Sequence, residues 1–176
     1  MQSAPTSATR ATPVGVQTET EASAPEVEVL IEVPRGSHLK RDSSGRVSFV
    51  SPLPCPYNYG CVPTHVGLEG DLLDALVLGP KLALGTRIRL KAWGAITLTD
   101  RGLSDDKLVC SATSPTPADC ERVLRFFRFY ARCKGLMNFV RARPGRNACD
   151  GWTTAAHALA RARPRDPSWT GYSIEF

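Results

Sequence analysis

Between residues 27 and 112 the chain carries a series of short strand-like runs, and in those over residues 27–33 and 86–90 apolar and polar side chains nearly alternate. An alternation with a period of two is typical of a strand that has one buried face. Residues that favour turns, such as glycine, proline and aspartate, separate these runs. Short strands at this spacing favour a small barrel or a sandwich. The runs cover residues 27–33, 47–50, 72–78, 86–90, 92–98 and 107–112.

The period changes to a helical one after residue 115. Thr116 can cap a helix that has Pro117 at its first position, and Gly135 is the expected stop. A second helix is expected over residues 153–163, with Pro164 after its end. Strands followed by helices indicate an α+β fold, which we expect to be a barrel with flanking helices.

The two ends of the chain differ in composition from the middle. Residues 1–25 consist mostly of Ser, Thr, Ala, Pro, Gln and Glu, too few of them bulky and apolar to offset the entropy of ordering. We therefore expect a disordered tail over residues 1–25, one domain over 26–163 and a C-terminal tail over 164–176. A length of 176 residues is ordinary for one domain.

The composition also excludes some classes of protein. Hydrophobic residues make up 42% of the chain and charged residues 22%, which excludes wholesale disorder. No apolar run approaches the roughly 20 residues of a membrane-spanning helix. The six cysteines form no Cys-x-x-Cys pair, and no secretory segment stands at the start, so reduced thiols in a soluble, cytoplasmic protein are expected.

The net charge of +5 is unevenly distributed. From Glu121 to Arg146 there are eight basic residues and a single acid, a pattern compatible with nucleic acid or an anionic substrate. However, Phe126, Phe127 and Tyr130 recur at the spacing of a buried helix face, so we favour a core role for them over stacking on bases.

The acids gather in two clusters. Glu69, Asp71 and Asp74 stand within six residues that include no Lys or Arg, directly before an apolar strand. Such a cluster is either a solvated turn or a cation site, because uncompensated like charges repel. Asp100 and Asp105 repeat the pattern at the ends of two later strands. If these ends share one mouth of a barrel, their oxygens suit Mg²⁺ or Mn²⁺.

Lys107 follows the second cluster and has two interpretations. It is either a cation for an anionic substrate or a local partner of Asp105 or Asp106, and the sequence alone leaves both open. Pro56-Tyr57-Asn58-Tyr59-Gly60 forms an aromatic turn, whose phenol groups either pack or reach a ligand.

Six segments occur in a fixed order that points to a known family. They include VLIEVPRGS from Val29, PYNYGCVP from Pro56, EGDLLDALVL from Glu69, DDKLV from Asp105, FFRFY from Phe126 and the Gly151-Trp152 pair. Their order and approximate spacing resemble those of the soluble family I inorganic pyrophosphatases, over roughly residues 27–160. The resemblance implies a five-stranded OB-like barrel with flanking helices. It also implies Mg²⁺-dependent hydrolysis of pyrophosphate to two phosphates, and a homo-oligomer.

The resemblance further implies a role for individual residues. Asp71 matches the general base of the family. The matching metal ligands are Glu69, Asp74, Asp105, Asp100 and Glu32. The residues that match phosphate-binding groups are Lys40, Tyr59, Lys107 and Tyr130.

The chain departs from the family pattern at several of these sites. Glu69 stands in place of an aspartate, and Arg101 in place of an acid after Asp100. Val47 and Ala131 stand where the family has cations that bind phosphate, although Arg46 or Arg132 could substitute. We therefore expect reduced activity. The alternative is a weak or inactive relative that binds polyphosphate or nucleic acid through its basic helix.

Overall fold

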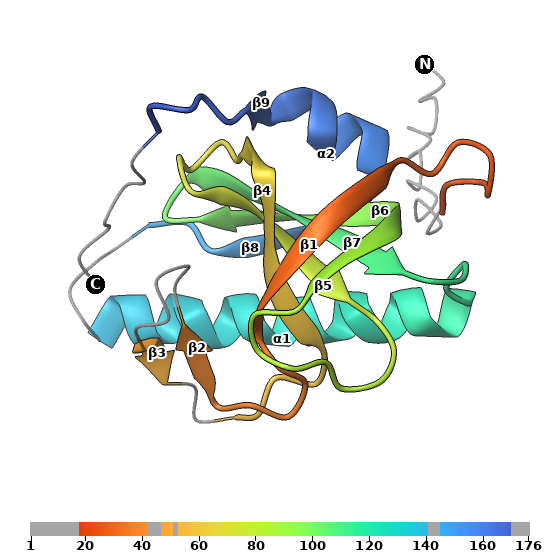
Figure 1. Ribbon diagram of the computed structural model, residues 1–176. Helices are drawn as coiled ribbons and strands as arrows, with labels where there is room; N and C mark the ends of the chain where they lie inside the picture. The colour runs from red at the N-terminus through yellow and green to blue at the C-terminus, as the bar shows by residue number, and fades with distance from the viewer. Residues whose placement is uncertain (1–17, 42–46, 51–52, 141–144, 170–176) are drawn as a thin grey trace, which may run out of the picture.

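The computed structural model of the protein describes residues 18–41, 47–50, 53–140 and 145–169. Its strands and helices follow one another as in Figure 1. The strands are β1 (Glu26–Val33), β2 (Leu39–Arg41), β3 (Val47–Val50), β4 (Asn58–Val66), β5 (Leu72–Val77), β6 (Arg87–Asp100), β7 (Leu103–Ser111), β8 (Ala148–Thr153) and β9 (Arg163–Pro164). The helices are α1 (Pro117–Val140) and α2 (Ala155–Arg161).

Five strands form a closed ring. The order is β1, β4, β5, β7 and β6, and β6 pairs with β1 again, so the sheet closes on itself as a small barrel. Only β5 and β7 run parallel in this ring. β8 extends the sheet beside β6, β9 pairs with β4, and β2 with β3 forms a separate hairpin. The ring and its two helices confirm the predicted α+β barrel.

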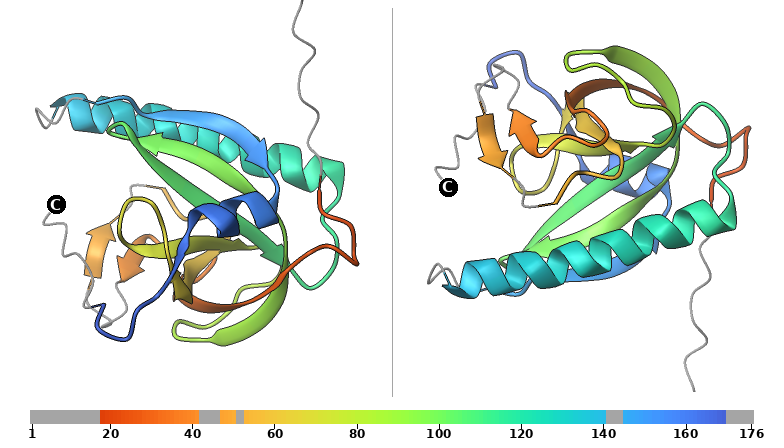
Figure 2. Two further views of the ribbon diagram at one scale, coloured as in Figure 1. Left: turned by 90° about the horizontal axis from the view of Figure 1, so that it is seen from above. Right: turned by 90° about the horizontal axis from the view of Figure 1, so that it is seen from below.

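The two helices close two hydrophobic clusters. α1 lies along one side of the sheet, next to β8 and β6, whereas α2 lies over another part of the ring (Figures 1 and 2). Ala75 and Leu108 belong to the cluster that contains α2 residues. Their neighbours Leu76 and Val109 belong to the cluster that contains Val123 and other residues of α1. Alternate residues of β5 and β7 are thus buried on opposite faces, as the pleat of a strand requires.

Some strands differ from the predicted ones. The two runs 86–90 and 92–98 form one strand, β6, because Lys91 continues the pairing with both β1 and β7. The predicted aromatic turn over 56–60 enters a strand instead, since β4 begins at Asn58. Gly60 makes this pairing possible, because a Cβ atom there would lie 1.9 Å from the carbonyl oxygen of Leu30 on β1.

The ends of both helices differ from the expected ones. α1 continues through Gly135, the expected stop, to Val140. At the start of α1 the backbone N–H of Asp119 donates a hydrogen bond to Oγ1 of Thr116, as is typical of an N-cap. α2 is shorter than residues 153–163, because Thr154 caps it and Arg163 leaves to pair with β4.

Parts of both predicted tails contact the barrel. The backbone N–H of Glu19 donates to the carbonyl of Trp93, and that of Arg165 donates to the carbonyl of Thr64. Residues 1–17 and 170–176 of these tails lie outside the described residues, and the division into a domain and tails stays a prediction. In the described part of the chain no helix has the length and apolar character needed to cross a membrane. All six cysteines are described, and each is a free thiol.

Candidate metal centre

The parallel pairing of β5 with β7 brings the two acidic clusters together. Asp74 on β5 pairs with Lys107 on β7, and Asp105 points to the same face as Lys107 because side chains alternate along a strand. Glu69 reaches this face from the turn between β4 and β5. An N–H···O bond of 2.7 Å from Gly67 to Asp71 closes that turn. The site is thus formed by segments far apart in the sequence.

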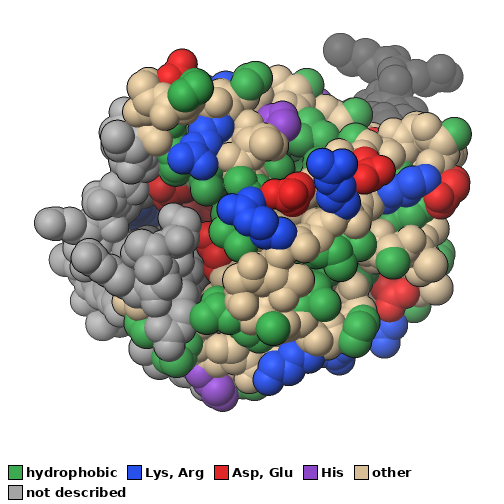
Figure 3. Space-filling model, viewed as in Figure 1, with side chains coloured by type: hydrophobic (Ala, Val, Ile, Leu, Met, Phe, Trp, Pro, Cys, Tyr) green, Lys and Arg blue, Asp and Glu red, His purple; other side chains and the backbone are tan. Residues whose placement is uncertain are grey.

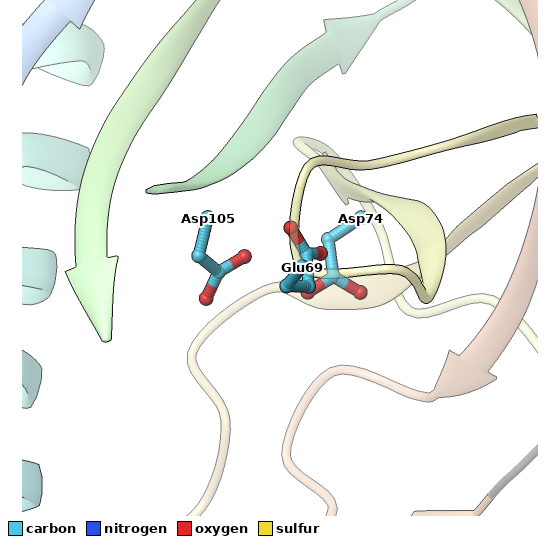
Figure 4. A group of neighbouring side chains, drawn as sticks. All are labelled: Glu69, Asp74 and Asp105. Carbon is cyan, nitrogen blue, oxygen red and sulfur yellow. The ribbon is translucent and has the colours of Figure 1, made fainter. Parts of the chain in front are cut away.

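Three carboxylates converge there. One oxygen each from Glu69, Asp74 and Asp105 lies within 4.8 Å of the others. Figure 4 shows Glu69 and Asp74 side by side, with Asp105 turned toward them. On the face drawn in Figure 3, acidic side chains also lie in a recess beside the atoms drawn in grey. Three carboxylates form the hard oxygen set that suits Mg²⁺ or Mn²⁺.

The electrostatics of Glu69 support a cation at this place. Its Oε2 atom is buried and has no hydrogen-bond partner in the described part of the chain. Burial, together with the charge of Asp105, raises the pKa of Glu69 to about 8. A buried carboxylate remains ionised at neutral pH where a cation or hydrogen-bond donors compensate its charge, and Oε2 of Glu69 has no such donor in the described residues. The residues present therefore fit a divalent metal ion.

Lys107 lies within the same group. Its Nζ atom donates to Asp74 at 2.5 Å and to Asp105 at 2.8 Å, so the interpretation as a local partner is confirmed. Burial opposes its charge, but Asp105 and Asp74 outweigh this effect and hold the pKa of Lys107 well above its usual value. The lysine is therefore charged at neutral pH. Its contact with a substrate stays a prediction.

Tyr59 completes this group from β4. Its hydroxyl donates to Asp74, and its ring lies 5.5 Å from the Nζ atom of Lys107. Burial, and next the charge of Asp74, raise the pKa of Tyr59 well above its usual value. The phenol therefore keeps its proton and can act as a donor.

A small pocket adjoins the three carboxylates. Asp105 lines it together with Asp100, Tyr130, Ala131 and Lys134, among others. The Nζ atom of Lys134 lies 2.7 Å from Oδ2 of Asp100, whereas Oδ1 of Asp100 is buried without a partner in the described chain. Sequence reasoning missed Lys134. Its spacing could have identified it, because Lys134 follows Tyr130 by one helical turn and therefore lies on the same face of α1 as Tyr130.

Other predicted residues are not members of the three-carboxylate group. Glu32 on β1 is buried and accepts a hydrogen bond of 3.3 Å from the thiol of Cys61. Asp71 lies in the turn that carries Glu69. Lys40 lies on β2, and its side chain is outside the described part. The roles of these residues stay predictions.

Of the two expected substitutes for the missing cations, only Arg132 lies in the described part of the chain. Arg132 is exposed and does not line the pocket, and Arg46 falls outside the described residues. Arg101 occupies the tight turn between β6 and β7 with a φ of 49°. The described chain shows no ion pair between Arg101 and Asp100; the cation beside Asp100 is Lys134.

The aromatic residues of α1 divide between core and surface. Phe127 is buried in the cluster between α1 and the sheet, as expected for a core residue. Phe126 is half-buried and stacks on Tyr130 at a centroid distance of 6.3 Å. Tyr130, predicted to bind phosphate, is 36% exposed and lines the pocket, so it lies at the surface and not in the core.

Comparison with models of protein families gives one match relevant to this site. The family described as inorganic pyrophosphatase matches residues 29–143, which is more than half of the chain and includes every residue of the metal centre.

Relatives of known name agree with this match. An inorganic pyrophosphatase of Gluconobacter oxydans is 33% identical over 93 residues, which are 48% of this chain and 54% of that protein. An inorganic pyrophosphatase of Streptomyces coelicolor is 38% identical over 93 residues, which are 48% of this chain and 57% of the relative. The matched part thus spans little more than half the length of these relatives.

Solved structures share the fold. The inorganic pyrophosphatase of Thermus thermophilus superimposes with a TM-score of 0.62 at 23% identity, over 77% of this chain and 86% of that one. The Helicobacter pylori enzyme gives a TM-score of 0.62 at 21% identity, over 81% and 92% of the two chains.

Proposed function

The chain belongs to the inorganic pyrophosphatase family, and we propose that it hydrolyses inorganic pyrophosphate to two phosphates with the help of Mg²⁺. The observation that carries this proposal is the convergence of Glu69, Asp74 and Asp105 around Lys107, inside the part of the chain that matches the family. Lys107 offsets one of the three negative charges, and a cation site accounts for the rest.

The metal ligands we propose are Glu69, Asp74 and Asp105, with Asp100 and Glu32 serving further ions. Bound Mg²⁺, or Mn²⁺ in its place, would supply Lewis-acid chemistry that makes water more acidic and offsets charge on the phosphates. The unpartnered oxygens of Glu69 and Asp100 support this assignment, because a buried carboxylate oxygen without a donor is otherwise costly.

Asp71 is the proposed general base. It belongs to the same turn as Glu69, and the bond between Gly67 and the Asp71 carbonyl holds the backbone of that turn. A carboxylate at this position would accept the proton of the attacking water, a role that carboxylates commonly have.

The phosphate groups would be held by donors around the carboxylates. Lys107 is charged at neutral pH, and Tyr59 keeps its phenolic proton. Tyr130 offers a hydroxyl at the pocket, and Lys40 is the further predicted cation. Charge-assisted bonds from such groups would balance the charge that develops on the phosphate oxygens during hydrolysis.

Binding of polyphosphate or nucleic acid through α1 is the second candidate. Exposed basic residues on this helix, among them Arg122, Arg125 and Arg128, support it. Hydrolysis is favoured, because a nucleic-acid binder would gain nothing from buried, converging carboxylates. We further infer that the protein is cytoplasmic, which its free thiols support, and that it forms homo-oligomers, which exposed Phe129 and Leu136 on α1 support.

The test is the release of phosphate by the purified chain from a panel of substrates. With millimolar Mg²⁺ we expect release from pyrophosphate, and much slower release from tripolyphosphate or a nucleoside triphosphate. Omission of Mg²⁺ should abolish the reaction. A protein that binds polyphosphate tightly but releases no phosphate from pyrophosphate would support the second candidate instead.

A further inference from the structure

Lys134 lies at the pocket without a role in the family pattern. It stands three residues after Ala131 and four after Tyr130, so all three share one face of α1. Its Nζ atom lies 2.7 Å from Asp100 and 5.9 Å from the ring centre of Tyr130. The lysine side chain is 25% exposed, and Lys134 is one of the residues that line the pocket.

The pocket has one basic residue in its described lining. Asp100 and Asp105 carry negative charge there, and Ala131 contributes only a methyl group. Lys134 alone among the described lining residues can therefore attract an anion.

Asp100 can hold Lys134 and a metal ion at once. Its Oδ2 atom pairs with Lys134, whereas its buried Oδ1 atom has no partner in the described part of the chain. A metal ion on Oδ1 would draw electron density from the carboxylate and weaken its hold on the lysine. The two cations thus oppose each other at Asp100, although both would attract phosphate.

We propose that Lys134 is a phosphate-binding residue of this site, which Asp100 and Tyr130 position, and that it replaces the cation absent at position 131. The inference rests on the proposed function, since the anion is a phosphate group of pyrophosphate. It also predicts two opposite effects of one substitution. Removal of the ammonium weakens binding of phosphate and, because a competing cation is lost, tightens binding of the metal.

The test is a pair of titrations of the full chain by calorimetry. The first measures the Kd of Mn²⁺, and the second measures the Kd of methylenediphosphonate, an analogue that is not cleaved, at saturating Mn²⁺. The variants are Lys134→Met, which keeps the apolar stem, Lys134→Gln, in case the first does not fold, and Lys134→Arg. Lys81→Met is the matched control, because Lys81 is exposed at the far end of β5 from Glu69.

We expect Lys134→Met to weaken binding of the analogue about tenfold or more and to tighten binding of Mn²⁺ by a few fold. Lys134→Arg should keep most of the affinity for the analogue, and Lys81→Met should change neither constant. If Lys134 only joins α1 to β6, the variant will melt earlier with both constants unchanged or both weakened, and the inference is wrong. If the unaltered chain binds neither ligand, the proposed function itself is wrong.

Discussion

Glu69 illustrates how much of the chemistry of this site depends on one residue. The side chain is largely buried beside Asp74 and Asp105, and burial raises its pKa to about 8. An unfolded chain releases the same proton near its ordinary pKa of 4.5. Between these two values the folded protein retains a proton that the unfolded chain has lost. The free energy of unfolding therefore falls as the pH rises through this range, unless a cation is bound.

The first prediction concerns Glu69→Gln in the presence of a chelator. Glutamine has no such proton to lose. The free energy of unfolding of the variant should therefore not show the decline between pH 5 and pH 8 that Glu69 causes. At pH 7.5 the variant should be more stable than the unaltered chain by up to about 4 kcal/mol. Urea denaturation at four pH values measures this. Parallel pH profiles of the two proteins would contradict the raised pKa.

The second prediction concerns Asp71→Asn. The amide keeps the shape of the side chain but accepts no proton, so hydrolysis of pyrophosphate should fall by about 10² or more. The melting temperature and the affinity for Mn²⁺ should remain near those of the unaltered chain. Asp150→Asn, a change at an exposed residue, is the control and should keep full activity. An Asp71→Asn variant with ordinary turnover would refute the role of the base.

At the level of elements, the sequence predicted the strands that alternate or form a short apolar run and missed a strand that looks like a turn. β1 alternates, β5 is a short and mostly apolar run, and both were predicted nearly to the residue. β4 contains Pro63 and the neighbouring pair Tyr59 and Gly60, so its sequence resembled a turn. Its glycine is required by the close approach of β1, which no local pattern reveals. The predicted end of α1 at Gly135 was wrong for a related reason. A glycine within a helix is tolerated when the helix packs on a sheet.

Two alanine substitutions test this contrast between the glycines. In Gly60→Ala the new Cβ atom would meet the Leu30 carbonyl oxygen at 1.9 Å, so the barrel should lose at least about 2 kcal/mol of stability. In Gly135→Ala the Cβ atom would lie 3.5 Å from Asn147, an ordinary contact. The helix should then gain about 0.5 to 1 kcal/mol. Chemical denaturation of both variants measures the difference, and equal effects would contradict the account.

At the level of the whole molecule, the site is a product of topology. Glu69 and Asp74 come from one segment and Asp105 from another, and only the parallel pairing of β5 with β7 joins them. The residue types and the family resemblance predicted these three carboxylates. They could not predict that Lys134 reaches Asp100, because this contact depends on where α1 crosses the end of β6. A pairing of Lys107 with Asp105 was likewise only one of the open interpretations, and its pairing with Asp74 was not predicted.

Because the site joins distant segments, a bound metal should stabilise the entire fold. An ion that binds only the folded chain raises its free energy of unfolding, by about 2.7 kcal/mol at a hundredfold excess over the Kd. For a chain of this size the melting temperature should rise by about 5 to 10 °C in millimolar Mg²⁺. The Asp105→Asn variant should show little of this rise. An unchanged melting temperature of the unaltered chain in both Mg²⁺ and Mn²⁺ would argue against the metal centre.

The central claim is that the three carboxylates make this chain an enzyme for pyrophosphate. Phosphorus NMR tests it most directly, because the signals of pyrophosphate and phosphate are followed in one sample. With Mg²⁺ the unaltered chain should convert pyrophosphate fully to phosphate, and the Asp105→Asn variant should leave it almost unchanged over the same time. Equal conversion by the two proteins, or no conversion by the unaltered chain at any concentration of Mg²⁺, would contradict the account.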